Sequence, residues 1–291
     1  MHSYLRAIGF SKYKSRNQLE KIYLETLRSP NRKVVTTISV DTSLIQFEKD
    51  FGEGIGIALI GEYDLNNSLS IEHYYPYIRG DYFLEYDNIS IEKQTDKESY
   101  AGICEDFTLG MTLIFYLQNI ADYAKSKWLN YSNRNLQQVR FSALSTQGVI
   151  LLGIKRDERQ LKYERDYKAS KNNLLAKAKK GDTDAIESLT LDEMDTYSSI
   201  SNRVKTEDIL SIIDTSFMPC GVECDHYMVI GNIAKVTEII NSVTNELVYN
   251  LLIETNDILL NVCINSIDLQ GEPKEGRRFR GEIWLQGFVR I

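Results

Sequence analysis

Residues 227–240 run Tyr227-Met-Val-Ile-Gly-Asn-Ile-Ala-Lys-Val-Thr-Glu-Ile-Ile240, and this stretch opens a β-rich region that continues to the last residue. Similar apolar runs follow at residues 247–253 and 258–264, and a final one lies within residues 271–291. Short β-type runs separated by Asn, Asp and Gly are typical of an antiparallel barrel or sandwich. The sequence therefore predicts that residues 217–291 form a small β-barrel-like module, with an OB-like barrel as one alternative.

A second β-rich part precedes it in residues 1–155. A helix is expected at residues 16–27, with Ser15 as its N-cap and Pro30 just beyond its end. A turn is predicted at Gln147-Gly148, between the last two of several β-type runs, which lie at residues 33–40, 44–47, 54–62, 68–77, 88–94, 99–104, 138–144 and 149–154. These elements predict an α+β domain with a mixed, largely antiparallel sheet.

The most regular helical pattern of the chain lies at residues 108–127. Apolar side chains recur there at helical spacing, namely at Leu109, Leu113, Tyr116, Leu117, Ile120 and Tyr123. The segment between Leu109 and Leu117 is apolar nearly all round, so the helix is expected to be buried against the sheet. Asp106 or Thr108 is expected to cap its first turn.

The middle of the chain is expected to be all helical. Residues 156–180 predict one long charged helix that ends at Gly181, and shorter helices are expected at residues 183–189, 191–203 and 206–214. Six basic residues recur every three positions in residues 156–171. Because three residues fall about 60° short of a full helical turn, these charges spiral around the helix and form no single basic face. Residues 156–216 are therefore predicted to be a helical connector.

Composition places the chain among ordinary globular proteins. It has 291 residues, of which 43% are hydrophobic and 26% are charged, and this length suits two domains. No signal peptide is expected at the N-terminus, and no apolar run approaches the roughly 18 residues of a membrane span. Four cysteines in a chain of this length do not indicate a disulfide scaffold. We therefore expect a soluble protein of the reducing cytoplasm that does not associate with a membrane.

The negative charge is concentrated in the C-terminal part. The chain has a formal net charge of -7, and residues 206–291 carry six Lys or Arg against thirteen Asp or Glu. Nucleic-acid binding draws its affinity from Lys and Arg that neutralise phosphates. The expected β-barrel-like module is therefore a poor nucleic-acid binder, and we expect no nucleic-acid partner.

The sharpest local cluster of reactive side chains is Cys220-Gly-Val-Glu-Cys224-Asp-His226. This spacing could supply three ligands to Zn²⁺. Structural zinc sites usually pair two short ligand clusters, however, and the sequence has no second one. Cysteine also often simply packs in the protein interior. We therefore predict no metal and no other cofactor.

The same cluster permits a nucleophilic cysteine. Cys224 could attack a substrate carbonyl with His226 or His73 as its base and Asp225 as the group that orients the base. Residues two apart in a strand share a face but usually lie too far apart for a good thiol–imidazole contact. Cys224, His226 and His73 are therefore weak catalytic candidates.

Two aromatic segments are candidates for a recognition surface. The first holds Tyr74, Tyr75, Tyr77 and Arg79, and the second holds Phe279 and Trp284. Tyrosine, tryptophan and arginine are enriched where proteins recognise partners. Alternating tyrosines are also ordinary content of a β-sheet, so a purely structural role remains an alternative.

Several segments spread over the chain resemble one family. They are Leu5-Arg-Ala-Ile-Gly-Phe-Ser-Lys12, Ser99-Tyr-Ala-Gly-Ile-Cys104, Leu113-Ile-Phe-Tyr-Leu-Gln-Asn119, Phe217-Met-Pro-Cys-Gly-Val-Glu-Cys-Asp225 and Gly276-Arg-Arg-Phe-Arg-Gly-Glu-Ile-Trp-Leu-Gln-Gly287. The chain resembles a family of uncharacterised proteins from anaerobic Gram-positive bacteria, described only as a domain of unknown function. The resemblance implies no particular activity and no catalytic residues.

Two classes of function are compatible with the sequence. The leading hypothesis is a non-enzymatic binding module that recognises a protein or a small polar ligand, because catalytic groups are few and the β-rich part is of a kind that commonly binds ligands. The alternative is a Cys/His-dependent hydrolase centred on Cys224 with His226 or His73. The two differ in whether Cys224 is an activated nucleophile.

Overall fold

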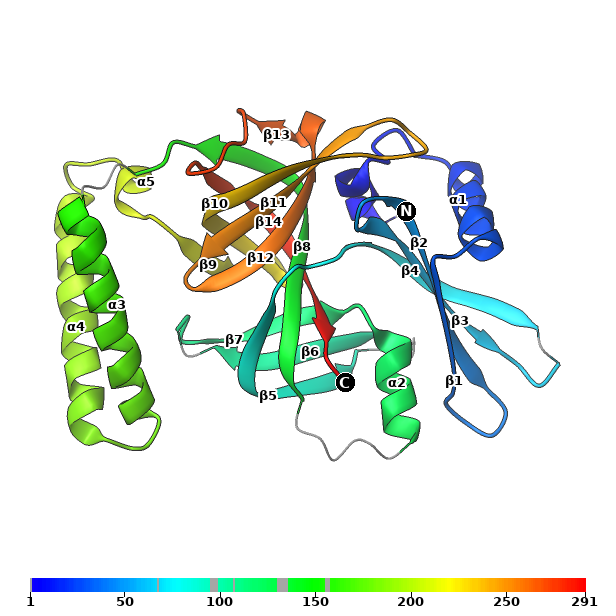
Figure 1. Ribbon diagram of the computed structural model, residues 1–291, viewed down its shortest axis with the longest axis horizontal. Helices are drawn as coiled ribbons and strands as arrows, with labels where there is room; N and C mark the ends of the chain where they lie inside the picture. The colour runs from blue at the N-terminus through cyan, green and yellow to red at the C-terminus, as the bar shows by residue number, and fades with distance from the viewer. Residues whose placement is uncertain (1, 67, 95–98, 107, 130–135, 155–157) are drawn as a thin grey trace. The chain divides into compact units, whose positions relative to one another are not determined.

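The chain folds into two compact units. The computed structural model describes residues 2–66, 68–94, 99–106, 108–129, 136–154 and 158–291 (Figure 1). One unit comprises Met1–Leu151 and Thr215–Ile291, and the other comprises Leu152–Asp214. The fold class is α+β, as the sequence predicts.

The first unit begins with two short helices and a four-stranded sheet. The 3₁₀-helix η1 spans Ser3–Ile8, and α1 spans Arg16–Arg28 with Ser15 and Gln18 forming the capping box of its first turn. The strands β1 (Arg32–Thr37), β2 (Ser43–Gly52), β3 (Ile55–Tyr63) and β4 (Leu69–Ile78) pair in chain order, and every pair is antiparallel. The predicted helix and the four predicted strands are confirmed. Residues 55–61 of β3 are all buried, because this strand has neighbours on both edges and both faces are covered.

A larger sheet contains the remaining strands of this unit. Its strands are β5 (Phe83–Lys93), β6 (Tyr100–Asp106), β7 (Met111–Leu117), β8 (Leu136–Leu151), β9 (Ser216–Pro219), β10 (His226–Ile240), β11 (Leu247–Thr255), β12 (Ile258–Asn265), β13 (Leu269–Gln270) and β14 (Arg278–Val289). The short 3₁₀-helix η3 (Ser266–Asp268) lies between β12 and β13.

The strands β8 and β14 are antiparallel neighbours and tie this sheet together. The pairings β10–β11, β11–β12, β12–β8, β8–β14 and β14–β10 close one circuit of hydrogen-bonded strands. A second circuit runs from β8 through β5, β6 and β7 to β14. Figure 1 shows the long β8 crossing the unit from one set of strands to the other.

The C-terminal strands therefore do not form a sheet of their own. The prediction of a separate β-barrel-like module at residues 217–291, with an OB-like barrel as one alternative, needs correction at this point, because β12 and β14 pair with β8, and β14 also pairs with β7. Turn residues mark where strands begin and end but do not say which strands become neighbours. The first and third of the three predicted parts, 1–155 and 217–291, contribute strands to one sheet.

The predicted buried helix at residues 108–127 is wrong in its first half. Residues Met111–Leu117 form β7, which pairs with β6, and only Ile120–Trp128 form a helix, α2. A short run that is apolar on all sides fits a buried strand as well as a buried helix. Asp106 accepts hydrogen bonds from the backbone N–H groups of Thr108 and Leu109, so it caps a turn between two strands.

The predicted turn at Gln147-Gly148 is also wrong, because both residues lie inside β8. A Cβ atom at position 148 would lie 2.4 Å from the Phe279 ring. Glycine is therefore needed here for the close approach of an aromatic ring from β14, and it does not mark a turn.

The second unit is helical, as predicted for the middle of the chain. It contains α3 (Glu158–Ala178), α4 (Thr183–Arg203) and α5 (Ile209–Ile212). The two short helices predicted at residues 183–203 form one continuous helix, whose N-cap is Asp182. The predicted start of the long helix at residue 156 lies outside the described residues.

Candidate functional site

A cavity of about 810 Å³ lies in the first unit, where β5, α2, the start of β8 and the end of β14 meet. Figure 1 shows the C-terminal end of β14 beside β5 and α2. Its apolar lining comes from Phe83, Ile89, Ile91, Leu129, Leu136, Phe288, Val289 and Ile291. Its basic lining comes from Arg32, Lys125, Lys127, Arg140 and Arg290, whereas Asp122 is the acidic side chain among the lining residues. The volume and the mixture of apolar and polar side chains are typical of small-molecule sites.

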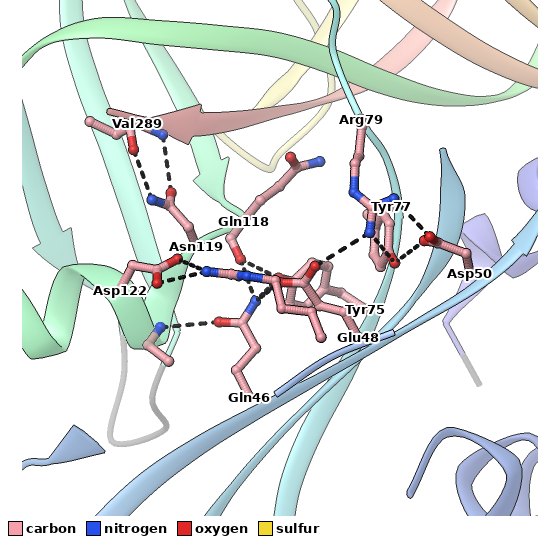
Figure 2. Close-up of polar contacts among 12 residues, drawn as sticks. Gln46, Glu48, Asp50, Tyr75, Tyr77, Arg79, Gln118, Asn119, Asp122 and Val289 are labelled. Carbon is pink, nitrogen blue, oxygen red and sulfur yellow. Dashed lines mark hydrogen bonds and ion pairs between the residues drawn. The ribbon is translucent and has the colours of Figure 1, made fainter. Parts of the chain in front are cut away.

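The wall formed by α2 is fixed to the sheets by buried polar contacts. Asn119, at the start of α2, donates its amide Nδ2 to the Val289 carbonyl at 2.8 Å and accepts from the Val289 N–H at 3.0 Å (Figure 2). Both carboxylate oxygens of Asp122 accept hydrogen bonds from one nitrogen of Arg32, Nη2, at 2.6 and 2.7 Å. The other Arg32 nitrogen reaches Glu48 at 2.7 Å, so α2 is held to β1 and β2.

The buried amide of Gln46 also anchors α2. It donates to the Gln118 carbonyl at 2.8 Å and to the Tyr75 hydroxyl at 3.2 Å, and it accepts from the Ala121 N–H at 3.0 Å (Figure 2). The Ala121 N–H belongs to the first turn of α2, whose N–H groups have no partners within the helix. A side chain of the four-stranded sheet thus supplies a hydrogen-bond acceptor to the first turn of the helix that lines the cavity.

The tyrosines predicted to form a recognition surface lie largely within the fold. Tyr75 and Tyr77 are only 2% and 3% exposed, and Tyr74 is half-buried with its hydroxyl accepting from the His2 backbone N–H at 2.7 Å. Burial raises the pKa of the Tyr77 phenol, which donates to Asp50 at 2.6 Å. Arg79 pairs with the same carboxylate at 2.8 Å (Figure 2). None of these four side chains lines the cavity.

The second predicted segment is also internal. Phe279 is fully buried, and Trp284 is 5% exposed. The Trp284 indole N–H donates to Asp225 Oδ2 at 2.7 Å, and its ring lies 4.7 Å from that of His2 and 5.1 Å from that of Tyr116. These aromatic side chains pack the core of the first unit.

The three histidines of the chain gather around this tryptophan. The His226 ring lies 5.6 Å from the Tyr4 ring, and the Tyr4 ring stacks on Trp284 at 5.4 Å. The His73 Nε2 lies 3.1 Å from the hydroxyl of Tyr116. Burial is the main cause that lowers the pKa of His2 to about 4.

The polar contacts of the predicted catalytic groups go to side chains outside the predicted set. Both ring nitrogens of His226 face carboxylates, Glu223 at 2.9 Å and Glu282 at 3.3 Å. Asp225 bonds to Trp284, and burial raises the pKa of its carboxyl. The Cys224 thiol is exposed and makes no hydrogen bond to any described residue.

The metal-ligand spacing seen in the sequence does not bring the cysteines together with the histidine. Glu223, Asp225 and His226 each offer one ligand atom, and these atoms lie within 4.8 Å of one another. In the described part of the chain, Cys220 and Cys224 are not members of that group. Cys104 and Cys263 are buried, and burial raises the pKa of the Cys104 thiol to about 12.

Two arginines that the sequence analysis does not single out dominate the cavity instead. The guanidinium carbon of Arg140 lies 4.8 Å from the centre of the Phe83 ring and 4.7 Å from that of Phe288. The guanidinium of Arg290 lies 4.6 Å from the Phe83 ring. These residues come from β5, β8 and the end of β14, and no local pattern in the sequence links positions so far apart.

The fold and the cavity define an α+β protein with a ligand-sized site whose lining is apolar and basic. Residues 5–287 match the family model described as "Domain of unknown function, E. rectale Gene description (DUF3881)". The match covers nearly the whole chain, so the chain belongs to this family, and the resemblance to a family of uncharacterised proteins is confirmed.

The other comparisons find no relatives. No curated protein and no solved structure matches the chain. None of the described helices is both long and apolar enough to cross a bilayer.

Proposed function

We propose that this chain is a non-enzymatic cytoplasmic binding protein whose small polar ligand occupies the cavity between β5, α2, β8 and β14. The observation that carries the proposal is the cavity itself, which has about 810 Å³ of space and a lining that is partly apolar and partly polar. Small-molecule sites commonly have volumes of roughly 300–1,000 Å³ and a few fixed polar groups on an apolar wall.

The rigidity of the cavity wall supports a binding role. Asn119 and Asp122 are each held by two hydrogen bonds, to Val289 and to Arg32. A site whose side chains are already fixed loses less conformational entropy when a ligand binds. The wall is therefore suited to recognise one ligand shape, and this favours a small ligand over a protein partner.

The charge of the lining indicates the polarity of the ligand. The chain as a whole has a net charge of -7, but Lys and Arg far outnumber Asp and Glu around the cavity. A local excess of positive charge on an acidic protein is typical of a site for an anionic or strongly polar molecule.

The Cys/His-dependent hydrolase has less support than the binding protein. A hydrolase needs a base within hydrogen-bond reach of the nucleophile. His226 instead faces Glu223 and Glu282, and the Cys224 thiol has no hydrogen-bond partner among the described residues. We expect Cys224 to react with iodoacetamide at the rate of an ordinary exposed thiol and His226→Gln to leave that rate unchanged. A fast reaction that slows in His226→Gln would favour the hydrolase.

The binding proposal can be tested while the ligand is still unidentified. The purified protein is incubated with a small-molecule extract of the cells that make it, separated from unbound compounds and denatured, and the released compounds are identified by mass spectrometry. Ser126 lines the cavity, so Ser126→Trp should fill part of it. Ser70→Trp places the same side chain at an exposed position on β4, outside the cavity, and is the matched control.

We expect the wild type and Ser70→Trp to retain the same compound and Ser126→Trp to lose it. If Ser126→Trp retains every compound that the wild type retains, the cavity is not the binding site and the proposal fails.

A further inference from the structure

Arg140 is half-buried, and its guanidinium lacks a hydrogen-bond partner among the described residues. Its Nε atom is shielded from solvent and has no hydrogen-bond partner. No hydrogen bond or ion pair joins the rest of its guanidinium to any described residue. Buried polar groups are nearly always hydrogen-bonded, and an unpaired one suggests that a partner is missing. Arg140 lines the cavity, so a molecule in the cavity could supply that partner.

Aromatic rings hold this guanidinium in place without satisfying its N–H groups. The Arg140 guanidinium contacts the rings of both Phe83 and Phe288, and Arg290 contacts the same Phe83 ring. Cation–π contacts use the face of the guanidinium and leave the N–H groups at its edge able to donate hydrogen bonds. The planar group is thus oriented in advance, which favours a ligand that accepts two parallel hydrogen bonds.

The carboxylates near Arg140 are not paired with it. Burial and the positive charges of Arg79 and Arg290 lower the pKa of Arg140, whereas Asp81 opposes them. Asp81 forms no ion pair with Arg140, and its carboxylate accepts a hydrogen bond from Asn261. Asp122, the acidic residue of the lining, is engaged by Arg32. Two arginines thus share one ring with no carboxylate paired to either of them in the described part of the chain.

We infer that Arg140, assisted by Arg290, is the seat for an oxyanion, so that the ligand of the proposed binding site carries a carboxylate or phosphate group. This inference rests on the proposed function and narrows it to organic anions. The remainder of the ligand packs on the apolar lining contributed by Ile89, Ile91 and Leu136. The shared chemistry is a negatively charged group with two or more oxygens on an apolar body.

The probes for this inference are phenyl phosphate and benzoate, with benzyl alcohol as the neutral counterpart. Binding of each probe to the full-length protein is followed by isothermal titration calorimetry. We expect both anions to bind more tightly than benzyl alcohol. The tighter of the two anions assigns the group as phosphate or carboxylate.

Variants at Arg140 identify the residue responsible. Arg140→Gln should weaken binding of the preferred anion by at least about tenfold, because a charge-assisted pair of hydrogen bonds is lost. Arg140→Lys keeps the charge but not the planar fork, so its loss should be smaller than that of Arg140→Gln. Arg280→Gln, an exposed position on β14 outside the cavity, is the matched control and should bind as the wild type does.

Two results would overturn the inference while leaving the binding site intact. One is equal affinity of Arg140→Gln and the wild type for the anions. The other is no binding of either anion, although a compound from the cell extract is retained by the wild type and lost in Ser126→Trp. If no extract compound depends on the cavity, the proposed function itself fails.

Discussion

The side chain of Gln46 joins several structural parts of the first unit. Its amide reaches the Gln118 carbonyl, the Tyr75 hydroxyl and the first turn of α2, and it is 1% exposed. Substitution by leucine would leave the Ala121 N–H and the Gln118 carbonyl with fewer partners in a buried site. We expect Gln46→Leu to lower the free energy of unfolding by about 1–3 kcal/mol, as measured by urea titration.

The control for this substitution is Gln137→Leu. Gln137 is exposed on β8, so the same change should alter the stability by no more than about 0.5 kcal/mol. Equal effects of the two substitutions on the free energy of unfolding would show that the buried amide of Gln46 stabilises the fold no more than an exposed glutamine does.

His2 gives the first unit a defined response to acid. Its pKa is lowered to about 4 in the folded protein, mainly by burial, and the ordinary value is 6.5. Because the folded state resists protonation of His2, this residue contributes stability that is present above pH 6.5 and is lost as the pH falls toward 4. Protonation also removes the acceptor at Nδ1, which receives the Tyr4 N–H at 3.4 Å.

We therefore expect the urea midpoint of the wild type to fall more steeply between pH 7 and pH 4.5 than that of His2→Gln. The comparison of slopes isolates His2, because the other titrating groups are common to both proteins. Parallel slopes would contradict the assigned burial of this imidazole.

Sequence reasoning identified the chemistry of single residues better than their surroundings. It named Tyr75, Tyr77 and Trp284 as recognition residues because of their type, but their partners, Gln46, Asp50 and Asp225, lie on other segments of the chain. Exposure of a tyrosine depends on what packs over its strand, and local sequence does not encode that. Arg140 and Arg290 were missed because only the pairing of β8 with both β5 and β14 brings them to the Phe83 ring.

At the level of elements, the pairing of β6 with β7 depends on one glycine. Gly102 lies opposite Phe115, and a Cβ atom at position 102 would lie 2.0 Å from the Phe115 ring. Phe115 is fully buried and cannot move out of the way. We expect Gly102→Ala to lower the free energy of unfolding by about 1–3 kcal/mol, because overpacking of a filled core costs that much.

A second substitution tests the cause. Phe115→Leu removes ring atoms next to position 102, so the double variant should lose less stability than the sum of the two single variants. Strictly additive losses in urea titrations would show that the ring is not what excludes a side chain from position 102.

The elements that were predicted correctly are those with clear boundaries. Helix α1 has its capping box, and β1 to β4 are separated by polar turns. The helix predicted over residues 108–127 failed because its apolar run is too short and too uniform to show a period. The tertiary partner decided the outcome, since β6 on one side and β14 on the other offer hydrogen bonds to β7.

For the whole molecule, the division into two units predicts that the first can fold without the second. Residues 152–214 are inserted between β8 and β9. In the sheet these strands are separated by β14 and β10, so they lie about 14 Å apart across the sheet, at about 4.8 Å per strand spacing. A flexible Gly/Ser linker of about eight residues spans roughly 16 Å.

We expect the protein in which this linker replaces residues 152–214 to unfold in one cooperative transition. It should also keep the affinity of the wild type for the preferred anion, because every residue that lines the cavity belongs to the first unit. Failure of this shortened protein to fold would show that the helical unit is required for the stability of the first.

The overall architecture could be predicted in part. The α+β class and the helical middle follow from periodicity and composition, whereas the joining of early and late strands does not. The parallel pairing of β12 with β8 links residues about 120 positions apart in the sequence, and no turn or cap marks such a contact. The cavity depends on the long-range pairings of β8 with β5 and β14, so the site could not be located before the fold was known.

The most direct test of the binding site is a crystal structure of the full-length protein grown with phenyl phosphate. We predict that the phosphate oxygens lie within hydrogen-bond distance of the Arg140 guanidinium and that the phenyl ring rests on the apolar lining near Ile89 and Leu136. The proposed site would be contradicted by a structure in which phenyl phosphate binds elsewhere. In that structure the cavity would hold only water, and Arg140 would be hydrogen-bonded to that water.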